Sequence, residues 1–247
     1  MTDTPDIQTL IDALRDPDWQ VRYDAADRLK VIGDARAVPA LIDVLNDENP
    51  TVKFIAAMTL GIIQDASAVD PLVAMLRASD DDSLLWASAW ALSEMGALSS
   101  EPLIDLLDSE DAITRDVAAD VLGGLADARA VPHLLDALMK HGMADYPETG
   151  RFGAADALER FDELSLTSFV QALYHSHPDI RARAADALGN IGLPEAIPAL
   201  VSCLEDTAQA NTPQGPIRVC DVAASALREI GTPEAEKAIQ AWAKGAS

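Results

Sequence analysis

Apolar residues recur along the chain with the spacing of short amphipathic helices, and the whole pattern then repeats itself. The segment from Val21 to Leu29 returns as Val52 to Leu60, and almost letter for letter as Ile180 to Leu188. Copies of this segment end at seven leucines spaced 30 to 39 residues apart: Leu29, Leu60, Leu92, Leu122, Leu158, Leu188 and Leu227. Self-similarity at this period indicates a stack of repeated structural units.

Each repeat is predicted to form two helices joined by a turn. In the second repeat, the apolar pattern from Ala37 to Leu45 predicts a first helix, with Pro39 near its start, where the missing N–H costs little. Residues 46–50 form the turn, and a second helix over 51–63 directs Val52, Ala56 and Leu60 toward the core. Neither helix can bury its apolar stripe alone, so neighbouring repeats must stack.

The predicted fold is therefore all-α, an α-solenoid (superhelix) of about seven two-helix repeats in a single domain over 1–247. The segment from Pro233 to Lys244 predicts a final helix that caps the stack, within a cap over 232–247. The predicted repeats are 6–33, 34–64, 65–97, 98–126, 127–161, 162–192 and 193–231.

Charge and composition narrow the functional class. With 18 Lys+Arg against 41 Asp+Glu, the formal net charge is −23, whereas nucleic-acid binding needs a basic face. No run of about 18 apolar residues predicts a membrane span, and Met1 to Ile7 lacks the features of a secretory signal. Two cysteines are too few for a disulfide framework. We expect a reduced, cytoplasmic protein whose negative field attracts basic or cationic-amphipathic partners.

A family resemblance rests on residues at matching places in the repeats. These are Pro39, Asp47, Val52 and Lys53, and the equally spaced Asp16, Val21 and Arg22. They resemble the HEAT repeat, and the stretches 34–41 and 127–134 look like the short bacterial HEAT-like repeats named after phycobilisome lyases. The resemblance implies a solenoid fold, but it leaves function open, because such repeats serve bilin lyases, hydroxylases and scaffolds.

The resemblance also implies that charged residues near the start of each second helix tie one repeat to the next. The residues at these places are Asp16 with Arg22, Asp47 with Lys53, and Arg115, Arg151 and Arg181. We interpret them as a structural ladder between repeats.

Catalytic and metal-binding motifs are absent from the sequence. Deoxyhypusine hydroxylase, an enzyme of this repeat class, carries His-Glu pairs that hold two irons, and no His-Glu pair occurs here. His175 and His177 fall in a turn before Pro178, and we expect them to be solvated. Cys203 and Cys220 fit buried packing positions better than reactive thiols. The sequence therefore predicts no catalytic residue, no metal and no cofactor.

Candidate binding residues occupy the third and seventh positions of each nine-residue segment, four residues apart on one helix stripe. In a HEAT-type solenoid the second helices line the concave face, so this stripe is expected to line a groove. Its members are Tyr23, Asp27, Phe54, Met58, Trp86, Trp90, Asp116, Asp120, Phe152, Asp156, Asp186 and Asp221. The early repeats thus present aromatic residues and the later ones mostly aspartate. Alternatively, the rings belong to the core and the groove lies one position along.

Two longer connections between first and second helices, 140–150 and 205–216, are further candidates. Longer loops in repeat proteins often carry binding function, and Tyr146 is the large aromatic residue among them. The alternative is that both are tolerated surface insertions.

These observations predict a non-enzymatic scaffold or adaptor that binds a basic or amphipathic segment of a partner protein. The alternative, implied by the resemblance, is a bilin lyase or bilin-binding chaperone. In that case an open tetrapyrrole would stack on Tyr23, Phe54, Trp86 and Trp90, with Asp116 or Asp120 near its pyrrole nitrogens. A DNA-repair glycosylase is excluded by the acidic face.

Overall fold

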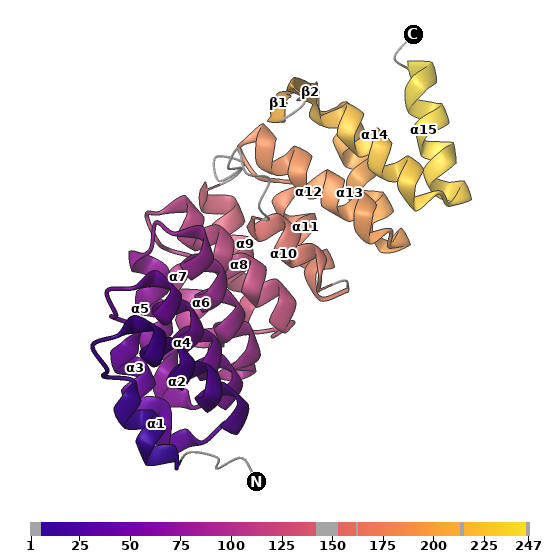
Figure 1. Cartoon of the computed structure of the whole chain (residues 1–247). Helices are drawn as coiled ribbons and strands as arrows, with labels where there is room; N and C mark the ends of the chain where they lie inside the picture. The colour runs from indigo at the N-terminus through magenta and orange to yellow at the C-terminus, as the bar shows by residue number, and fades with distance from the viewer. Residues whose placement is uncertain (1–5, 142–152, 162, 213–214, 246–247) are drawn as a thin grey trace. The chain divides into compact units, whose positions relative to one another are not determined.

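Helical hairpins follow one another along the computed structural model of the chain (Figure 1), which describes residues 6–141, 153–161, 163–212 and 215–245. Within these residues the chain forms fifteen α-helices and one short β-hairpin. The helices belong to two compact units, Met1–Leu106 and Leu107–Ser247. The prediction of an all-α fold built from two-helix repeats is confirmed.

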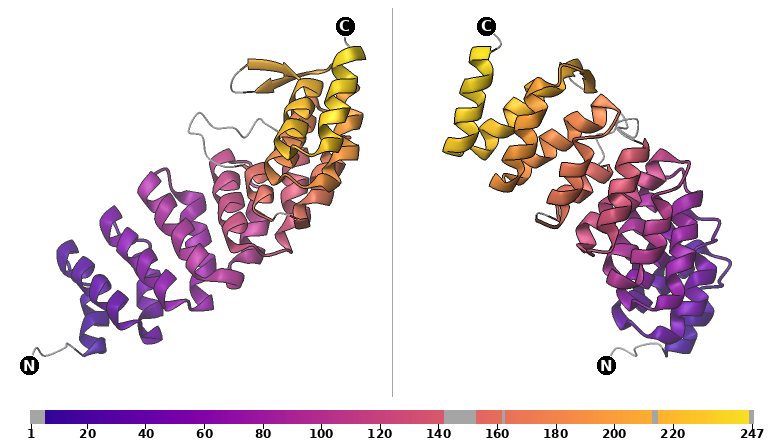
Figure 2. Two further views of the ribbon diagram at one scale, coloured as in Figure 1. Left: turned by 90° about the vertical axis from the view of Figure 1, so that its right-hand side faces the viewer. Right: turned by 180° about the vertical axis from the view of Figure 1, so that it is seen from behind.

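The N-terminal unit contains three complete helix pairs and the first helix of the fourth repeat. Its helices are α1 (Ile7–Ala13), α2 (Trp19–Ile32), α3 (Val38–Val44), α4 (Pro50–Ile63), α5 (Val69–Ala78), α6 (Asp82–Glu94) and α7 (Ser100–Leu106). Short 3₁₀ turns at Ala35–Ala37, Ala66–Ala68 and Gly96–Leu98 precede α3, α5 and α7. The second helices α2, α4 and α6 pack side by side, as the stacked hairpins in Figure 2 show.

The C-terminal unit continues the same pattern. Its helices are α8 (Ala112–Leu125), α9 (Ala130–His141), α10 (Ala154–Glu159), α11 (Glu163–Ala172), α12 (Pro178–Ile191), α13 (Ile197–Ser202), α14 (Val219–Ile230) and α15 (Pro233–Gly245). The final helix α15 packs against α14 and α13, where the sequence predicts a capping helix. The prediction that 1–247 is one domain stays a prediction.

Polar side chains set where the second helices begin, at the same place in successive repeats. The Asp18, Asn49 and Asp81 side chains accept hydrogen bonds from backbone N–H groups two residues further along, at Gln20, Thr51 and Ser83. Such caps satisfy donors that have no partner within the helix. The cap fixes the register of each second helix, and with it the face on which every later side chain lies.

The core consists of the apolar residues that recur at the same place in each repeat. All seven anchor leucines, from Leu29 to Leu227, have 0% exposure, as do Val52 and Ala56. Many of the other buried positions are alanine or valine, whose small side chains let neighbouring second helices approach closely. Burial of these side chains is the main force that holds the repeats together.

Glycine brings three pairs of second helices into near contact. A Cβ added at Gly61 would lie 2.7 Å from the Ala91 Cα, and one at Gly123 would lie 3.0 Å from the Ala157 Cα. Gly189 meets Ala226 in the same way, at 2.8 Å. In each pair the glycine follows one anchor leucine and the alanine precedes the next. These junctions have no room for a side chain.

The segment 205–216, expected as either a binding loop or a surface insertion, contributes most of a hairpin in which β1 (Gln209–Thr212) pairs antiparallel with β2 (Gly215–Arg218). Ala210 has 0% exposure and packs with Ala182 and Val219. The backbone N–H of Asn211 donates to Asp179 Oδ1 of α12 at 2.8 Å. The hairpin is therefore anchored to the preceding repeat.

Candidate interaction site

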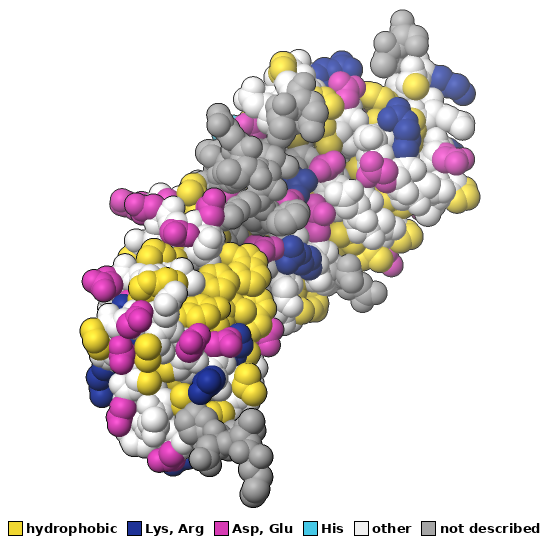
Figure 3. Space-filling view, in the orientation of Figure 1, with side chains coloured by type: hydrophobic (Ala, Val, Ile, Leu, Met, Phe, Trp, Pro, Cys, Tyr) yellow, Lys and Arg dark blue, Asp and Glu magenta, His cyan; other side chains and the backbone are white. Residues whose placement is uncertain are grey.

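Aromatic and apolar side chains gather on the second helices of the N-terminal unit, where Figure 3 shows hydrophobic groups together. The rings of Phe54 and Trp86 stack with centroids 5.9 Å apart and planes inclined by 11°. Trp86 and Trp90 stack at 6.4 Å and 19°. Trp86 is 53% exposed, and Phe54, Met58 and Trp90 are partly exposed. We call these four residues, with Tyr23, Val31 and Ile62, the aromatic face.

Helix geometry explains why these side chains share one face. Phe54, Met58 and Ile62 follow one another at intervals of four along α4, so they form one stripe beside the core stripe of Val52 and Ala56. Trp86 and Trp90 do the same on α6. Because the second helices pack side by side, the stripes of adjacent helices meet. The alternative in which all the rings enter the core does not hold for Trp86, whose indole is half exposed.

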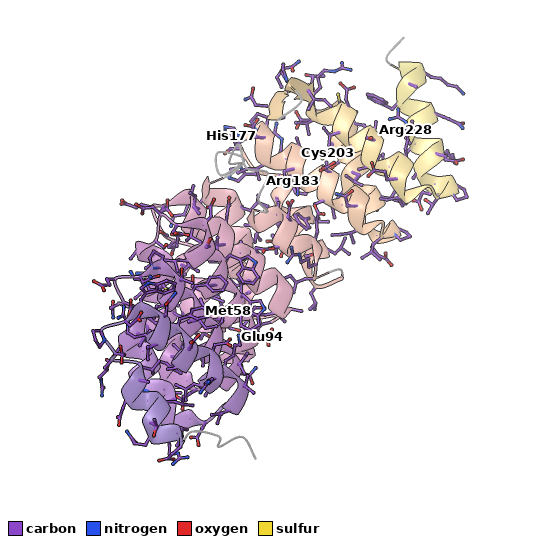
Figure 4. All side chains as sticks on the ribbon, in the orientation of Figure 1. Met58, Glu94, His177, Arg183, Cys203 and Arg228 are labelled. Atoms are coloured by element: carbon purple, nitrogen blue, oxygen red, sulfur yellow. The ribbon has the colours of Figure 1, made fainter. Side chains whose placement is uncertain are left out.

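Sequence reasoning missed two members of this face. Val31 is 83% exposed and Ile62 is 44% exposed. They lie four residues beyond Asp27 and Met58, so one further step of the same period would have found them. On α6 the corresponding residue is Glu94, which is exposed. Figure 4 labels Met58 and Glu94 in this unit.

The carboxylate expected within the aromatic stretch is already paired. Asp27 Oδ1 accepts a hydrogen bond from Lys30 Nζ at 2.6 Å. Asp24 and Glu94 are exposed carboxylates on α2 and α6. The aromatic face therefore has acidic neighbours in a protein of net charge −23.

The aspartates in the later repeats do not form the open acidic surface that the sequence predicted. Asp116 is 2% exposed, and Gly153 of the next repeat lies beside it: a Cβ on Gly153 would lie 3.8 Å from Asp116 Oδ1. It therefore cannot belong to an open acidic surface. Phe152 and Tyr146 lie outside the described residues.

The remaining aspartates of the stripe have arginine partners. Asp120 pairs with Arg160 at 2.6 Å, and Asp221 pairs with Arg218 at 2.7 Å. Asp156 and Asp186 both pair with Arg183, the latter at 2.7 Å. These salt bridges compensate much of the negative charge on the stripe, so the C-terminal unit does not present the bare acidic wall that the sequence suggested.

Glu159, which the stripe does not include, lies beside the Arg183 cluster. Its Oε1 is 3.2 Å from Arg183 Nη2, and its Oε2 accepts a 3.4 Å hydrogen bond from Asn190. Burial raises the pKa of Glu159 above its usual range; the Asn190 hydrogen bond lowers it, and the charge of Asp186 raises it further. The fold thus disfavours the ionised form of this carboxyl.

The predicted ladder between repeats is present at Arg22 and Arg181. Arg22 donates from Nε and Nη2 to both carboxylate oxygens of Asp47, at 2.6 and 2.8 Å. Arg181 binds Asp206 in the same way, at 2.7 and 3.2 Å. Asp16 contributes only its carbonyl to Arg22, so each arginine reaches forward to the next repeat. The prediction that these residues tie one repeat to the next is therefore confirmed for Arg22 and Arg181.

Electrostatics of the ladder follow from its geometry. Burial acts to raise the pKa of Asp47, but hydrogen bonds from Arg22 and from the Asn49 backbone, with the nearby cations, bring it below its usual value. Hydrogen bonding from Arg181 lowers the pKa of Asp206. Arg151, the remaining predicted member, lies outside the described residues.

His175, His177 and the two cysteines occupy turn, capping and buried positions. His177 caps α12, accepting from Asp179 N–H, and His175 accepts from the His177 N–H. Cys203 and Cys220 are buried, and burial raises the pKa of the Cys203 thiol. Among the described residues, no three His, Cys, Asp or Glu side chains are grouped to hold a metal ion. None of the helices they form is long and apolar enough to cross a membrane.

The repeat arrangement, the ladder and the stacked second helices define the class as a HEAT-type α-solenoid. A family model for HEAT repeats matches residues 7–93 and 138–212, and one for the PBS lyase HEAT-like repeat matches 114–138. The chain belongs to the HEAT-repeat family. No curated protein matches this sequence.

Solved structures show the same kind of fold. The CpcE–CpcF complex of phycocyanin lyase from Nostoc sp. PCC7120 is 21% identical, with a TM-score of 0.46 over 98% of this chain and 96% of that one. Human deoxyhypusine hydroxylase is 21% identical, with a TM-score of 0.42; the match covers 91% of this chain and 84% of that one. A Kap121p mutant is 13% identical, with a TM-score of 0.55 over 98% of this chain and 36% of that one. At these identities the likeness shows the fold alone.

Proposed function

We propose that this protein is a non-enzymatic interaction scaffold, and that its aromatic face binds a basic or amphipathic segment of a partner protein. The observation that supports this most directly is the half-exposed Trp86, stacked between Phe54 and Trp90. Large aromatic groups left in water forfeit the hydrophobic stabilisation that burial would give them. Trp residues are also frequent centres of protein interfaces.

The stack prepares Trp86 for binding. Its neighbours on both sides hold the indole in one orientation, so a partner would not have to immobilise it. Met58 and Ile62 extend the apolar area along α4, and Val31 extends it on α2. An amphipathic helix or an extended segment could lay an apolar side along these residues.

Charge supports a basic partner. The whole chain carries a net charge of −23, and Asp24 and Glu94 stand exposed on the helices of the aromatic face. Such a field speeds the approach of cationic segments and repels acidic ones, more strongly at low salt. Binding should therefore weaken as the salt concentration rises.

Bilin binding is the second candidate, because near-parallel rings could also stack a flat tetrapyrrole. The propionates of a bilin would require Arg or Lys nearby. Lys30, on α2 beside the face, is paired with Asp27 at 2.6 Å. This pairing favours the protein segment over the bilin.

Photo-crosslinking distinguishes the two candidates. A benzophenone amino acid placed at position 86 of the full chain would be activated in lysate of the source organism at low salt, and the crosslinked species identified by mass spectrometry. The matched control carries the same group at Trp19, which is 41% exposed but outside the aromatic face.

A peptide of net positive charge, crosslinked at position 86 and not at position 19, would support the proposal. Its synthetic copy should bind the wild-type chain at least about 30-fold more tightly than the Trp86→Ala/Trp90→Ala variant. A crosslinked species that absorbs visible light would support the bilin-binding hypothesis instead. An acidic peptide, or equal capture at both positions, would contradict the proposal.

A further inference from the structure

A cavity lies between the second and third repeats, and none of the residues of the aromatic face lines it. It has a volume of about 630 Å³ and is lined by α3, α4, α5, the turn after α5 and the start of α6. Its apolar wall includes Ile42, Leu45, Pro50, Met75 and Leu84. This volume lies within the range of small-molecule sites, about 300 to 1,000 Å³.

The cavity coincides with an interruption of the ladder. Lys53 occupies the position that Arg22 and Arg181 occupy in their repeats, six residues after the start of the turn. Those arginines bind a carboxylate of the following repeat, Asp47 or Asp206, in two-point contacts. In the repeat that follows Lys53, the corresponding residue is Ser79, which has no charge.

Lys53 consequently has no carboxylate in the following repeat to bind, unlike Arg22 and Arg181. Arg22 also donates to the Asp16 and Pro17 carbonyls of its own turn. Among the described residues, Lys53 makes neither a hydrogen bond nor an ion pair, although it is partly buried and lines the cavity. A cation removed from part of its water gains from a close anion.

The two carboxylates that also line the cavity do not supply this anion. Asp81 Oδ1 accepts from the backbone N–H groups of Ser83 and Leu84 at the start of α6, at 2.8 and 3.4 Å. Asp80 is exposed. Lys53 forms no ion pair with either residue. Its charge does act on Asp47, whose pKa it lowers, but both Asp47 carboxylate oxygens are already bound by Arg22.

We propose that this cavity binds a small aliphatic carboxylate. The ligand carboxylate would contact Lys53 Nζ where Asp47 and Asp206 contact their arginines, and its alkyl chain would lie against Ile42, Leu45, Met75 and Leu84. An apolar body with one terminal anion matches an apolar wall beside a cation that makes no direct hydrogen bond or ion pair. This inference is independent of the function proposed for the aromatic face.

Methyl NMR of the full chain tests the proposal with octanoate, octanol and octylammonium as probes. The Met75 methyl signal reports directly on the cavity wall and is assigned with a Met75→Leu variant. Physiological salt screens the general negative charge of the protein. Octanoate should shift the Met75 signal saturably and bind about tenfold more tightly than octanol, because it adds a charge-assisted contact.

Two variants test the role of the cation. Lys53→Met should weaken octanoate binding about tenfold and leave octanol binding unchanged, whereas the control Lys30→Met should change neither. Ser79→Asp supplies the missing carboxylate from the protein, so it should weaken octanoate binding and raise the Tm. Equal affinity for octanol or octylammonium would overturn the proposal. So would the absence of a saturable shift, or a Lys53→Met variant that binds octanoate normally.

Discussion

Arg22 of the first repeat holds Asp47 of the second through two hydrogen bonds, from Nε at 2.6 Å and from Nη2 at 2.8 Å. The same guanidinium donates to two carbonyls of its own turn, at Asp16 and Pro17. One side chain therefore connects a turn, a helix and the following repeat. Arg181 and Asp206 show the same relationship in the C-terminal unit.

Removal of one ladder arginine should destabilise the fold strongly. The Arg22 and Asp47 side chains are only 9% and 8% exposed, so Arg22→Ala leaves a nearly buried carboxylate without its partner. We expect a loss of about 3–5 kcal/mol in the free energy of unfolding. The matched control is Arg36→Ala, which removes an exposed pair with Asp34 and should cost at most about 1 kcal/mol. Urea unfolding followed by circular dichroism measures both; equal losses would contradict a structural role for the ladder.

The ladder also predicts acid sensitivity. Because the folded pKa of Asp47 lies below its unfolded value, its contribution to stability is complete above the unfolded pKa of about 3.9 and is lost as pH falls through the folded pKa. The Asp47→Asn variant should start less stable at pH 7, and its Tm should fall less than that of wild type between about pH 5 and pH 3. Asp43→Asn, at an exposed aspartate on α3, serves as the control and should follow the wild-type curve. Parallel curves for wild type and Asp47→Asn would refute the assignment.

Two adjacent glycines of α8 should respond in opposite ways to alanine. A Cβ at Gly123 would lie 3.0 Å from the Ala157 Cα, whereas one at Gly124 would meet nothing closer than 3.9 Å. We expect Gly123→Ala to cost about 1–3 kcal/mol through overpacking. Gly124→Ala should stabilise by about 0.5–1 kcal/mol, because alanine favours the helix. Chemical denaturation of both variants checks this, and a stable Gly123→Ala would show that α8 and α10 can separate without penalty.

Neutralising Glu159 should stabilise the protein at neutral pH. Its folded pKa is raised by burial, so the stability linked to this group is highest below the unfolded pKa and falls as pH rises through the folded value. Glu159→Gln keeps a polar contact for Asn190 without the charge. Its Tm should match wild type near pH 4 and exceed it by about 1–3 °C at pH 8. Glu195→Gln, at an exposed site, is the control. A lower Tm at pH 8 would mean that the Arg183 contact outweighs the burial of charge.

Most of the fold could be predicted from the repeat period, because each anchor leucine occupies the same packing environment in its repeat. All seven of these leucines are fully buried. The same period placed Trp86 on an exposed stripe. It could not identify the partners of Asp120 and Asp156, because Arg160 and Arg183 come from neighbouring helices whose distance along the chain has no fixed relation to contact. Asp116 is buried, and its neighbour Gly153 belongs to the next repeat, which a stripe on one helix does not contain.

Because Arg22 and Arg181 bind a carboxylate of the following repeat, the repeats that carry them have two unlike ends, one with a cation and one with an anion. In the seventh repeat the arginine position holds Cys220, a neutral side chain with 2% exposure. Head-to-tail polymerisation of such a molecule would require a free guanidinium at one end for Asp16 at the other. With Cys220 at this position, the seventh repeat has no ladder arginine to offer to Asp16 of a second molecule.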